Sequence, residues 1–447
     1  MKKQVKTIGI LGAGLVGSLL SIYLKQRGYD VTILEKRGDL RKSKSQAGRS
    51  INLALSRRGI KALKEVRVFD KIQSIMLPME GRMMHDTSGE LTFQPYGKEG
   101  EHINSISRSI LNEHLLDAAE EAGVKLLFKH ECDDISIDET SIHFKNDTNT
   151  GYLEFDLIFG ADGAYSKLRQ AMLKTNRFNY EQFYIEHGYK ELTIPPTING
   201  DYAIEPNALH IWPRGKFMLI ALPNLDKSFT CTLFFPFEGQ PSFESIKNED
   251  DVVDFFQKTF SDTIGLIPTL KTEYLANPTS SLVTVKCYPW VRNNCVLIGD
   301  AAHAIVPFYG QGMNAGFEDC VVLNQLLDQH SDDWEQVLTS YQAIRKKDGD
   351  AITDLALHNF IEMRDLVADE KFLLQKKIEG SIQEAFPDKW IPLYSMVTFS
   401  DLRYSEALAI GKKQQIIMDE VMQQPNIFEN WKKLDLQKIV DKLTSNQ

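Results

Sequence analysis

Two glycine-bearing segments constrain the fold of this chain most strongly. The first, residues 12–17, reads Gly-Ala-Gly-Leu-Val-Gly, and the second, residues 297–314, contains the pair Gly299-Asp300. A strand-like run at residues 5–11 precedes the first segment, and a stretch with helical periodicity at residues 15–27 follows it. This strand–turn–helix order is typical of a βαβ dinucleotide-binding unit.

Each glycine of the first segment has a distinct role in such a unit. Gly12 permits the tight turn, Gly14 lets the backbone approach a pyrophosphate, and Gly17 allows the helix to pack closely on the strand. Glu35 closes the next predicted strand, where a carboxylate can accept hydrogen bonds from both ribose hydroxyls. The same carboxylate would repel a 2′-phosphate, which disfavours NADP at this position. The alternative is a tight strand–helix turn without a ligand.

The second segment predicts a contact with the other end of an extended ligand. A predicted strand at residues 295–298 places Asp300 at the carboxyl edge of the sheet, where it can bind a ribityl hydroxyl. We expect the loop with Gly312 to open a helix whose first amides, at Met313 and Asn314, face the pyrimidine edge of a flavin. The alternative is a glycine-rich connection with a capping Asp. Two contact segments at opposite ends of one ligand favour FAD over NAD.

The nucleotide-binding domain is predicted to be discontinuous. A third buried strand, residues 155–159, runs into Asp162-Gly163, a pair that is common in turns and means little by itself. Between the glycine segments, prolines and strand-like runs predict an inserted, mostly antiparallel sheet, and from Trp334 onward the pattern is helical. The predicted fold class is therefore α/β, a Rossmann-like FAD-binding domain with an inserted antiparallel-sheet substrate domain and a C-terminal helical region. The predicted limits are 1–78, 101–178 and 286–350 for the FAD-binding domain, 79–100 (a hairpin) and 179–285 for the substrate domain, and 351–447 for the helical region, which we expect to cover the substrate pocket.

Composition excludes several classes of protein. The 447 residues carry a net charge of -10, which gives no support for a nucleic-acid partner. The five cysteines are scattered without CxxC pairing, so neither a disulfide framework nor a zinc site is expected. The chain reaches a strand pattern too early for a signal peptide and contains no apolar run near the ~18 residues of a membrane helix. We expect a cytoplasmic protein without stable membrane insertion, in which residues 434–443 form a solvated helix rather than a membrane contact.

The order of the three glycine markers resembles that of the single-component flavin-dependent aromatic hydroxylases, the class typified by p-hydroxybenzoate hydroxylase. Five further stretches resemble the kynurenine 3-monooxygenase family, and together they span nearly the whole chain. These stretches are residues 49–56 (RSINLALS), 81–85 (GRMMH), 307–312 (PFYGQG), 359–364 (NFIEMR) and 392–399 (PLYSMVTF). Eukaryotic members carry a C-terminal membrane anchor, whereas this chain ends in a polar segment and looks like a bacterial-type form.

The resemblance implies an activity and a set of site residues. It implies hydroxylation of L-kynurenine to 3-hydroxykynurenine with NADPH and O2, through a flavin C4a-hydroperoxide and without a metal. It implies FAD contacts from Arg108 and Asp300, and Ala54 is a further predicted contact. It implies that kynurenine binds through Arg82, Tyr96, Asn359, Tyr394 and Phe308. NADPH is expected to visit transiently because the sequence has no second glycine fingerprint. We expect no indispensable acid or base, with Glu362 tuning the polar side of the pocket.

These residue types suit such a substrate. An Arg offers the bidentate geometry that a carboxylate prefers, tyrosine hydroxyls add donors, and Phe308 and Phe234 are candidates for a dry aromatic wall. The position of Arg82 is open, because a hairpin loop over residues 86–89 pairs it near Phe93 and puts Tyr96 on the other face. An odd-length loop, or a kink at Pro95, brings Arg82 and Tyr96 together.

Further alternatives remain open at this point. Asn359 lies on an apolar helical stripe, where a satisfied core residue is the alternative to a ligand, and His303 is interpreted as a helix-packing residue rather than a base. A second enzyme interpretation is a flavin hydroxylase of another aromatic acid, which substrate-dependent NADPH oxidation across a small panel of aromatic compounds would distinguish. A non-catalytic binding protein on the same fold, as in Rab-escort and GDP-dissociation-inhibitor relatives, would not need the Gly299-Asp300 contact. A flavin halogenase is disfavoured because no Trp-x-Trp-x-Ile-Pro stretch is present.

Overall fold

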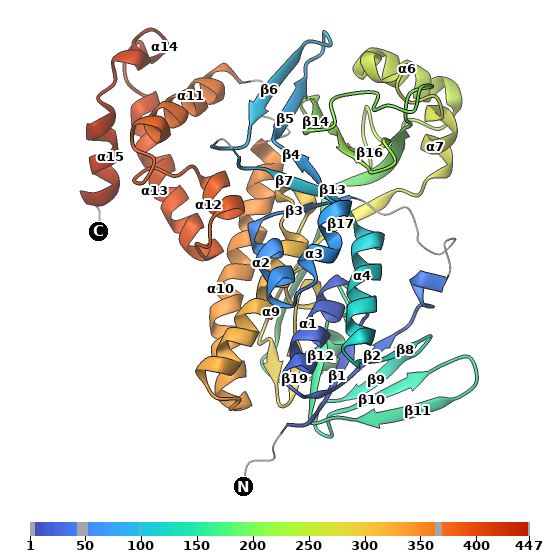
Figure 1. The fold of residues 1–447 in the computed structure, drawn as a ribbon. Helices are drawn as coiled ribbons and strands as arrows, with labels where there is room; N and C mark the ends of the chain where they lie inside the picture. The colour runs from blue at the N-terminus through green and yellow to red at the C-terminus, as the bar shows by residue number, and fades with distance from the viewer. Residues whose placement is uncertain (1–4, 43–51, 99, 363–368, 446–447) are drawn as a thin grey trace.

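A computed structural model describes residues 5–42, 52–98, 100–362 and 369–445 (Figure 1). Residues 49–51 and 363–364, which belong to two of the stretches that carry the resemblance, lie outside this described part. The chain builds two large sheets, one at each end of the molecule, with a set of C-terminal helices beside the upper sheet in Figure 1.

The first sheet is the nucleotide-binding sheet. Its six strands have the order β18-β19-β12-β1-β2-β8, and β1 pairs in parallel with both β12 and β2. Their bounds are β1 Thr7–Leu11, β2 Asp30–Glu35, β8 Lys125–Phe128, β12 Leu157–Gly160, β18 Val291–Arg292 and β19 Cys295–Leu297. The predicted strands at residues 5–11, 155–159 and 295–298 are thus brought side by side from distant parts of the chain. The strands are buried on both faces, which explains their continuous apolar runs.

Helices pack on this sheet and form the hydrophobic core of the nucleotide-binding unit with it. Helix α1 packs against α4 and α9, and α9 also contacts the long helix α10. The bounds are α1 Leu15–Gln26, α4 Arg108–Glu121, α5 Lys167–Leu173, α8 Asp300–His303, α9 Gly312–Gln329 and α10 Trp334–Ile361. A three-stranded meander extends from the sheet near α5, with β9 Glu131–Ser136, β10 Ser141–Lys145 and β11 Thr150–Glu154.

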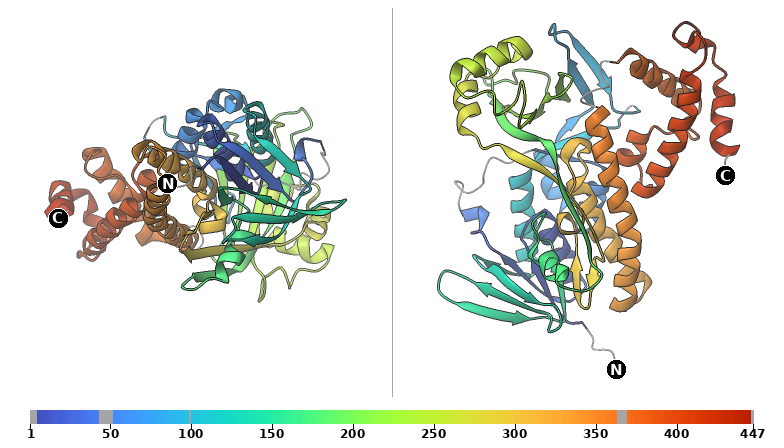
Figure 2. Two further views of the ribbon diagram at one scale, coloured as in Figure 1. Left: turned by 90° about the horizontal axis from the view of Figure 1, so that it is seen from below. Right: turned by 180° about the vertical axis from the view of Figure 1, so that it is seen from behind.

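The second large sheet has seven strands in the order β17-β13-β16-β15-β14-β5-β6. All neighbours are antiparallel except β14 and β5, which are parallel. The bounds are β5 Gly81–His85, β6 Leu91–Pro95, β13 Asn179–Ile194, β14 Ala208–Pro213, β15 Met218–Pro223, β16 Phe229–Pro236 and β17 Ser280–Tyr288. The predicted hairpin therefore joins the inserted sheet. The long strands β13 and β17 run lengthwise between the two ends of the molecule (Figure 2).

Two helices of this second unit were not expected from the sequence. Helices α6 Glu249–Thr259 and α7 Leu270–Ala276 lie between β16 and β17 in the chain and cover one face of the sheet. Asn248 caps α6 by accepting from the amide of Asp251, whose carboxylate accepts in return from the Asn248 amide. A capping box is a local signal, so the sequence did contain evidence for this helix.

A small third sheet connects the two units. It has the order β3-β7-β4, with β3 Asn52–Leu55, β4 Leu77–Met79 and β7 Ile103–Ser107. The short helices α2 Arg57–Glu65 and α3 Phe69–Ile72 follow β3. Because α2 contacts both α9 and α12, it lies between the nucleotide-binding unit and the C-terminal helices.

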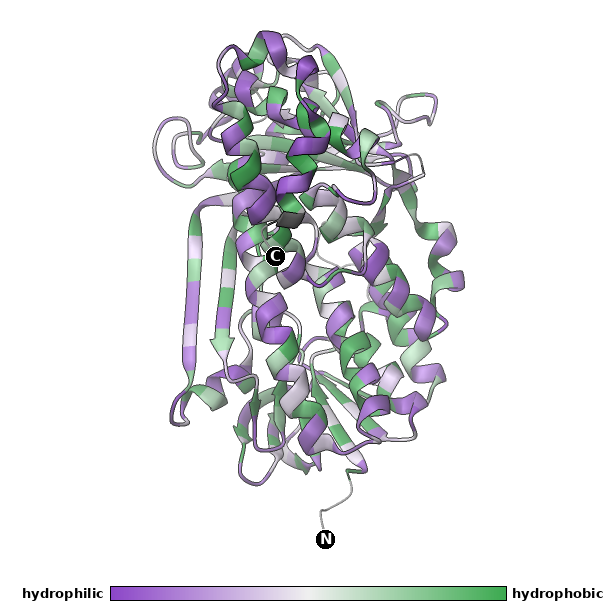
Figure 3. Ribbon diagram, turned by 90° about the vertical axis from the view of Figure 1, so that its left-hand side faces the viewer, coloured by the Kyte–Doolittle hydropathy of each residue, from purple (hydrophilic) through white to green (hydrophobic). Residues whose placement is uncertain are grey.

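The C-terminal helices form a bundle beside the second sheet. Their bounds are α11 Glu370–Ala385, α12 Leu393–Phe399, α13 Tyr404–Met422, α14 Ile427–Asn430 and α15 Leu436–Ser445. Hydrophobic and hydrophilic residues alternate along these helices in Figure 3, as expected for amphipathic elements with one buried face. Helix α12 packs into the apolar cluster that surrounds Phe308 and Tyr309, whereas α11, α13 and α15 share a separate core around Trp390.

Candidate active site

A cavity of about 320 Å³ lies where the two units and helix α12 meet. Its lining comes from the turn after β1, from β3, from the seven-stranded sheet, from the segment 298–313 and from α12. The two glycine segments of the sequence thus face the same space. At its cofactor end the lining includes Gly14, Leu15, Ala54, Arg108, Gly163, Asp300, Gly312 and Met313.

The glycines of the first turn each meet a separate steric demand. Gly12 has a φ of +97°, a left-handed conformation that favours glycine. A Cβ on Gly17 would lie 2.1 Å from the Gly12 carbonyl oxygen, so only glycine lets α1 approach the turn this closely. A Cβ on Gly14 would meet no atom of the described residues within 4 Å and would instead project into open space at the cavity.

Glu35 is buried beneath this turn and lies outside the cavity lining. Its carboxylate accepts from the Ala13 amide at 2.9 Å, and from the Arg37 amide and Nε at 2.9 and 2.8 Å. Burial alone would raise the pKa of Glu35, but the Arg37 guanidinium and these amides outweigh it and the net direction is downward. The group is therefore a carboxylate at neutral pH, and its contact with a ribose stays a prediction.

The Gly299-Asp300 turn is held from behind by a buried carboxylate. Gly299 has a φ of +59°, and its amide donates to Asp319 Oδ2 at 3.0 Å. The side chain of Asp300 is exposed toward the cavity, and helix α9 begins nearby at Gly312. The first N–H groups of α9 have no intrahelical acceptor. They lie at the end of the helix where Gly312 and Met313 line the cavity.

Asn314 has a structural role through its side chain. Its Nδ2 donates to the carbonyls of Ala54 and Gly310 at 2.8 and 2.9 Å, and its Oδ1 accepts from the Ser56 amide at 3.0 Å. The residue therefore joins β3 to the start of α9. The predicted contact of its backbone amide with a flavin stays a prediction.

The cofactor end of the cavity fits FAD. Two helix N-termini, those of α1 and α9, supply free N–H groups at separate points of the lining, and Gly14 and Gly163 leave open space beside them. The Arg108 guanidinium lines the same space without an ion-pair partner among the described residues, which suits a pyrophosphate. Asp300 lines the same space with an exposed side chain, and its contact with a ribityl hydroxyl stays a prediction.

The opposite end of the cavity contains Arg82, Tyr96 and Tyr394. The Arg82 guanidinium carbon lies 4.7 Å from the ring centroid of Tyr394 and 5.5 Å from that of Tyr96. The two tyrosine rings stack at 5.4 Å, and Tyr394 also stacks on Tyr309 at 5.5 Å. Within the described part of the chain, neither Arg82 Nε nor Tyr96 Oη has a hydrogen-bond partner, although both atoms are buried. Such unsatisfied donors are costly unless a ligand pairs with them.

The electrostatics of this end favour an anion. Burial would lower the pKa of Arg82, but Tyr394, Tyr96 and Glu362 outweigh it and the net direction is upward. Burial raises the pKa of Tyr96 and of Tyr309 well above the ordinary value, so both remain neutral donors at physiological pH. The site thus offers one fixed cation together with neutral hydroxyls.

Aromatic and aliphatic side chains form the wall between the two ends. Phe234 and Phe308 line the cavity with ring centroids 4.8 Å apart, and Phe308 stacks on Phe360 at 4.3 Å. Met218, Ile220 and Leu222 of β15 complete this wall. The surface is largely apolar, which suits a substituted benzene ring.

Two predicted residues lie behind the lining. Asn359 is buried, and its Nδ2 donates to the Phe308 carbonyl at 2.6 Å, so it fixes the segment that carries Phe308. Glu362 is close enough to Arg82 and Tyr309 to raise the pKa of both. Direct binding of substrate by Asn359 stays a prediction.

His303 belongs to a buried ion cluster that the sequence did not reveal. Its Nε2 lies 2.6 Å from Asp319 Oδ2, and its ring stacks on Trp290, which agrees with a packing role. Arg345 donates to Asp319 Oδ1 at 2.7 Å and also pairs with Glu318 and Asp348. In the sequence these are ordinary helix charges, and no local pattern separates them from a solvated face.

Replacing Asp319 should destabilise the protein and change its acid sensitivity. Burial would raise the pKa of Asp319, but His303 and Arg345 outweigh it and lower the pKa. The stabilisation is therefore present above the unfolded value of about 3.9 and is lost as the pH falls through the lower folded pKa. We expect Asp319→Asn to cost about 3 kcal/mol at pH 7 and the difference from wild type to shrink below pH 4.

Urea unfolding at several pH values measures this effect. The matched control is Asp328→Asn, because Asp328 lies on the same helix with a side chain that is 71% exposed. A free energy of unfolding for Asp319→Asn equal to that of the control at pH 7 would contradict the assignment.

Comparison with known proteins agrees with this geometry. Residues 4–356 match the family described as FAD binding domain, which covers more than half of the chain. A solved structure of 2-methyl-3-hydroxypyridine-5-carboxylic acid oxygenase superposes with a TM-score of 0.68 at 19% identity, covering 83% of this chain and 96% of that one. The fold and site therefore define a flavoprotein with an FAD-binding domain, which confirms the predicted fold class and cofactor.

The sequence relatives narrow the class further. The chain is 51% identical over 440 residues to kynurenine 3-monooxygenase of Christiangramia forsetii, covering 98% of both chains. It is also 51% identical over 427 residues to the enzyme of the same name from Flavobacterium johnsoniae, covering 95% of both. The chain belongs to the kynurenine 3-monooxygenase family. None of its described helices is both long and apolar enough to cross a bilayer.

Proposed function

We propose that this enzyme hydroxylates L-kynurenine at ring carbon 3, next to the amino group, with NADPH and O2 as co-substrates. One oxygen atom enters the ring and the other leaves as water, while NADPH is oxidised to NADP⁺. The proposal is supported above all by the buried Arg82 Nε, which has no hydrogen-bond partner among the described residues. It lies beside Tyr96 and Tyr394, at one end of a cavity whose other end fits FAD. It is further supported by membership of a family named for this reaction.

The side chains act by binding and orientation. The Arg82 guanidinium receives the substrate carboxylate, and the Tyr96 and Tyr394 hydroxyls donate to its second oxygen. Phe234 and Phe308 hold the aminophenyl ring flat and exclude water from it. When bound, FAD supplies the activation of O2 with electrons from NADPH. The amino group of the substrate activates the adjacent ring carbon, so the protein need not provide an acid or base at that carbon.

NADPH is proposed as a transient reductant. The sequence contains one glycine fingerprint, and its turn faces the cavity that fits FAD. We also propose that the enzyme works in the cytoplasm, because all five cysteines are free thiols, four of them buried, as is usual in a reducing compartment.

The decisive experiment is NADPH consumption by the purified protein with and without L-kynurenine, combined with mass analysis of the product. We expect consumption to rise when kynurenine is added and the product to gain one oxygen atom at carbon 3. A panel of aromatic acids without an amino acid side chain serves as the control. Faster, coupled turnover of a panel member than of kynurenine would contradict the substrate assignment.

A further inference from the structure

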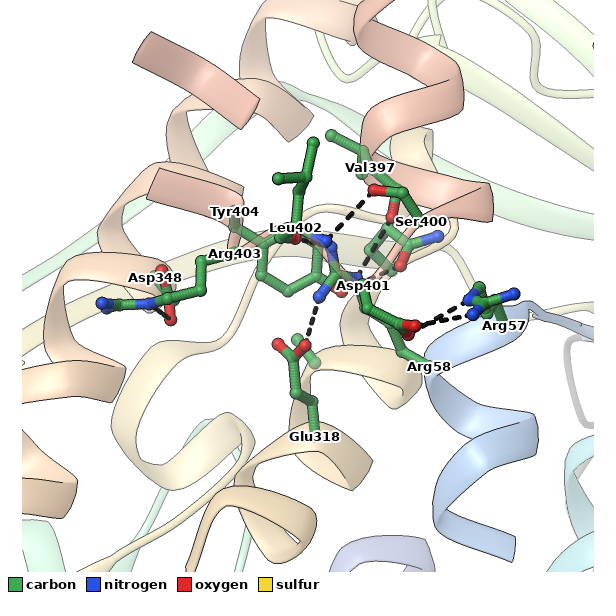
Figure 4. Close-up of polar contacts among 12 residues, drawn as sticks. Arg57, Arg58, Glu318, Asp348, Val397, Ser400, Asp401, Leu402, Arg403 and Tyr404 are labelled. Atoms are coloured by element: carbon green, nitrogen blue, oxygen red, sulfur yellow. Dashed lines mark hydrogen bonds and ion pairs between the residues drawn. The ribbon is translucent and has the colours of Figure 1, made fainter. Parts of the chain in front are cut away.

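Arg58 lies at the junction of the nucleotide-binding unit and the C-terminal helices. It belongs to α2, which directly follows the cavity-lining strand β3, and it is only 2% exposed. Its Nε donates to the Val397 carbonyl at 3.1 Å, and its two terminal nitrogens donate to the Leu402 carbonyl and to Glu318 (Figure 4). The guanidinium carbon lies 4.0 Å from the ring centroid of Tyr404. All three of its nitrogens are therefore engaged within the protein.

The bonds to Val397 and Leu402 fix the end of helix α12. Val397 lies in the last turn of α12, where backbone carbonyls lack intrahelical partners, and Leu402 lies in the connection to α13. A buried cation at this end satisfies two carbonyls and also interacts favourably with the helix dipole. With only seven residues, α12 is too short to be stable without such contacts.

The same helix carries Tyr394 at its first turn. Tyr394 is the residue of α12 that lines the cavity, between Tyr96 and Tyr309 and beneath Arg82. Because Val397 follows Tyr394 by a single helical turn, a displacement at the Arg58 end of α12 moves the Tyr394 ring as well. Arg58 itself does not reach the substrate end of the cavity.

Arg58 is anchored by a network of ion pairs. Glu318 of α9 is shared between Arg58 and Arg345, and Arg345 is 1% exposed with bonds to Asp319 at 2.7 Å and to Asp348. Asp348 also accepts from Arg403 at 3.0 Å, just before α13. The network therefore connects the helix that begins at the flavin end of the cavity with both ends of the 397–403 segment.

We propose that Arg58 is a positioning residue that holds α12, and thereby Tyr394, against the substrate end of the cavity. Arg58 contributes to substrate affinity and to the coupling of NADPH oxidation with hydroxylation, and it leaves FAD binding unaffected. The kinetic part of this inference rests on the proposed function, whereas the structural part does not.

The test compares Arg58→Leu with Arg57→Leu. Arg57 precedes Arg58 on α2 and pairs with Asp401 of the same connection, but both side chains are more than half exposed, so that pair contributes little. Amide hydrogen exchange of residues 393–404 is measured on each protein, together with FAD content, the KM for kynurenine and the release of hydrogen peroxide.

We expect Arg58→Leu to keep its FAD and to exchange residues 393–404 faster than wild type. Its KM for kynurenine should rise roughly tenfold, the change that about 1.4 kcal/mol of binding free energy produces, and peroxide release should increase. Arg57→Leu should stay close to wild type. Arg58→Lys keeps the charge opposite Glu318 but loses the fork to two carbonyls, so an intermediate result is expected.

Equal exchange and equal KM in Arg58→Leu and Arg57→Leu would overturn the proposal. If Arg58→Leu does not fold, Arg58→Lys is compared with Arg57→Leu by the same measurements, and equal exchange and equal KM in these two variants would overturn the proposal. If the wild-type protein fails to hydroxylate kynurenine, the proposed function is wrong. The exchange rates of residues 393–404 still test whether Arg58 holds α12.

Discussion

Arg82→Ala is expected to retain FAD and to lose coupled hydroxylation, with kcat/KM for kynurenine lower by a factor of about 100 to 1000. Removing one partner of a desolvated, hydrogen-bonded charge pair typically costs about 3–4 kcal/mol, and Arg82 is the cation whose buried Nε is left without a partner in the described residues. NADPH oxidation should continue with release of hydrogen peroxide. The substrate ring, once unanchored, no longer intercepts the oxidant, and water can enter the site beside it. Steady-state kinetics with peroxide detection measures both effects.

Two variants make this expectation specific. Arg82→Lys keeps the positive charge but cannot bind a carboxylate through two parallel hydrogen bonds, so we expect it to recover only part of the loss. Thr92→Ala changes an exposed residue of β6, the strand that pairs with β5, and should behave as wild type. If Arg82→Ala turned over kynurenine at the wild-type rate with the same coupling, Arg82 would not be part of the site.

The second large effect concerns two glycines of the same turn, Gly14 and Gly17. Gly14→Ala should leave the stability of the apoprotein within about 0.5 kcal/mol of wild type, because the new Cβ meets no atom within 4 Å in the part of the chain that the structure describes. It should weaken FAD binding about a hundredfold, since that Cβ fills the space where the backbone approaches the pyrophosphate. Gly17→Ala should instead destabilise the apoprotein by about 3 kcal/mol, because its Cβ would lie 2.1 Å from a backbone carbonyl oxygen.

Each variant serves as the control for the other. Thermal unfolding of the apoprotein separates them by stability, and titration with FAD separates them by affinity. A Gly14→Ala protein that binds FAD as tightly as wild type would show that the pyrophosphate does not pass over this turn.

The parts of the fold that the sequence predicted are those specified locally. The turn at Gly12 and the buried strands around it depend on residues within a short window, and apolar runs that end in glycine identify them without tertiary information. The flavin end of the site follows from the same short patterns. The family resemblance then supplied the predicted substrate residues, which scattered Tyr and Arg positions do not identify by themselves.

In the β5–β6 hairpin, a shift of one residue in strand register decides whether Arg82 and Tyr96 lie on the same face of the sheet. Asp86 Oδ1 accepts from the amides of Ser88 and Glu90, and Gly89 adopts a φ of +87°, which closes a three-residue loop. Arg82 therefore faces Gln94, and Tyr96 falls on the same face of the sheet. The pairing with Phe93 that a four-residue loop would give was wrong, and the odd-length alternative is confirmed.

The residues that the sequence did not reveal are those whose partners are remote. Arg58 bonds carbonyls more than 300 positions away, and Asp319 unites His303 with Arg345. In the sequence each is a charge on an amphipathic helix, identical in appearance to a solvated one. Helical periodicity identifies the buried face of a helix, but it does not identify which distant carbonyl or carboxylate meets that face.

The two ends of the cavity differ in what encloses them. Phe234 lies on a central strand of the seven-stranded sheet and Phe308 is held through its carbonyl by Asn359, whereas the cover beside Arg82 is the seven-residue helix α12. Added bulk at the Phe234 and Phe308 end would therefore meet side chains of the sheet and of the segment that Asn359 holds, whereas bulk at the Arg82 end would meet α12. We expect the bonds from Arg58 to the α12 segment to set how much bulk that end of the cavity accepts.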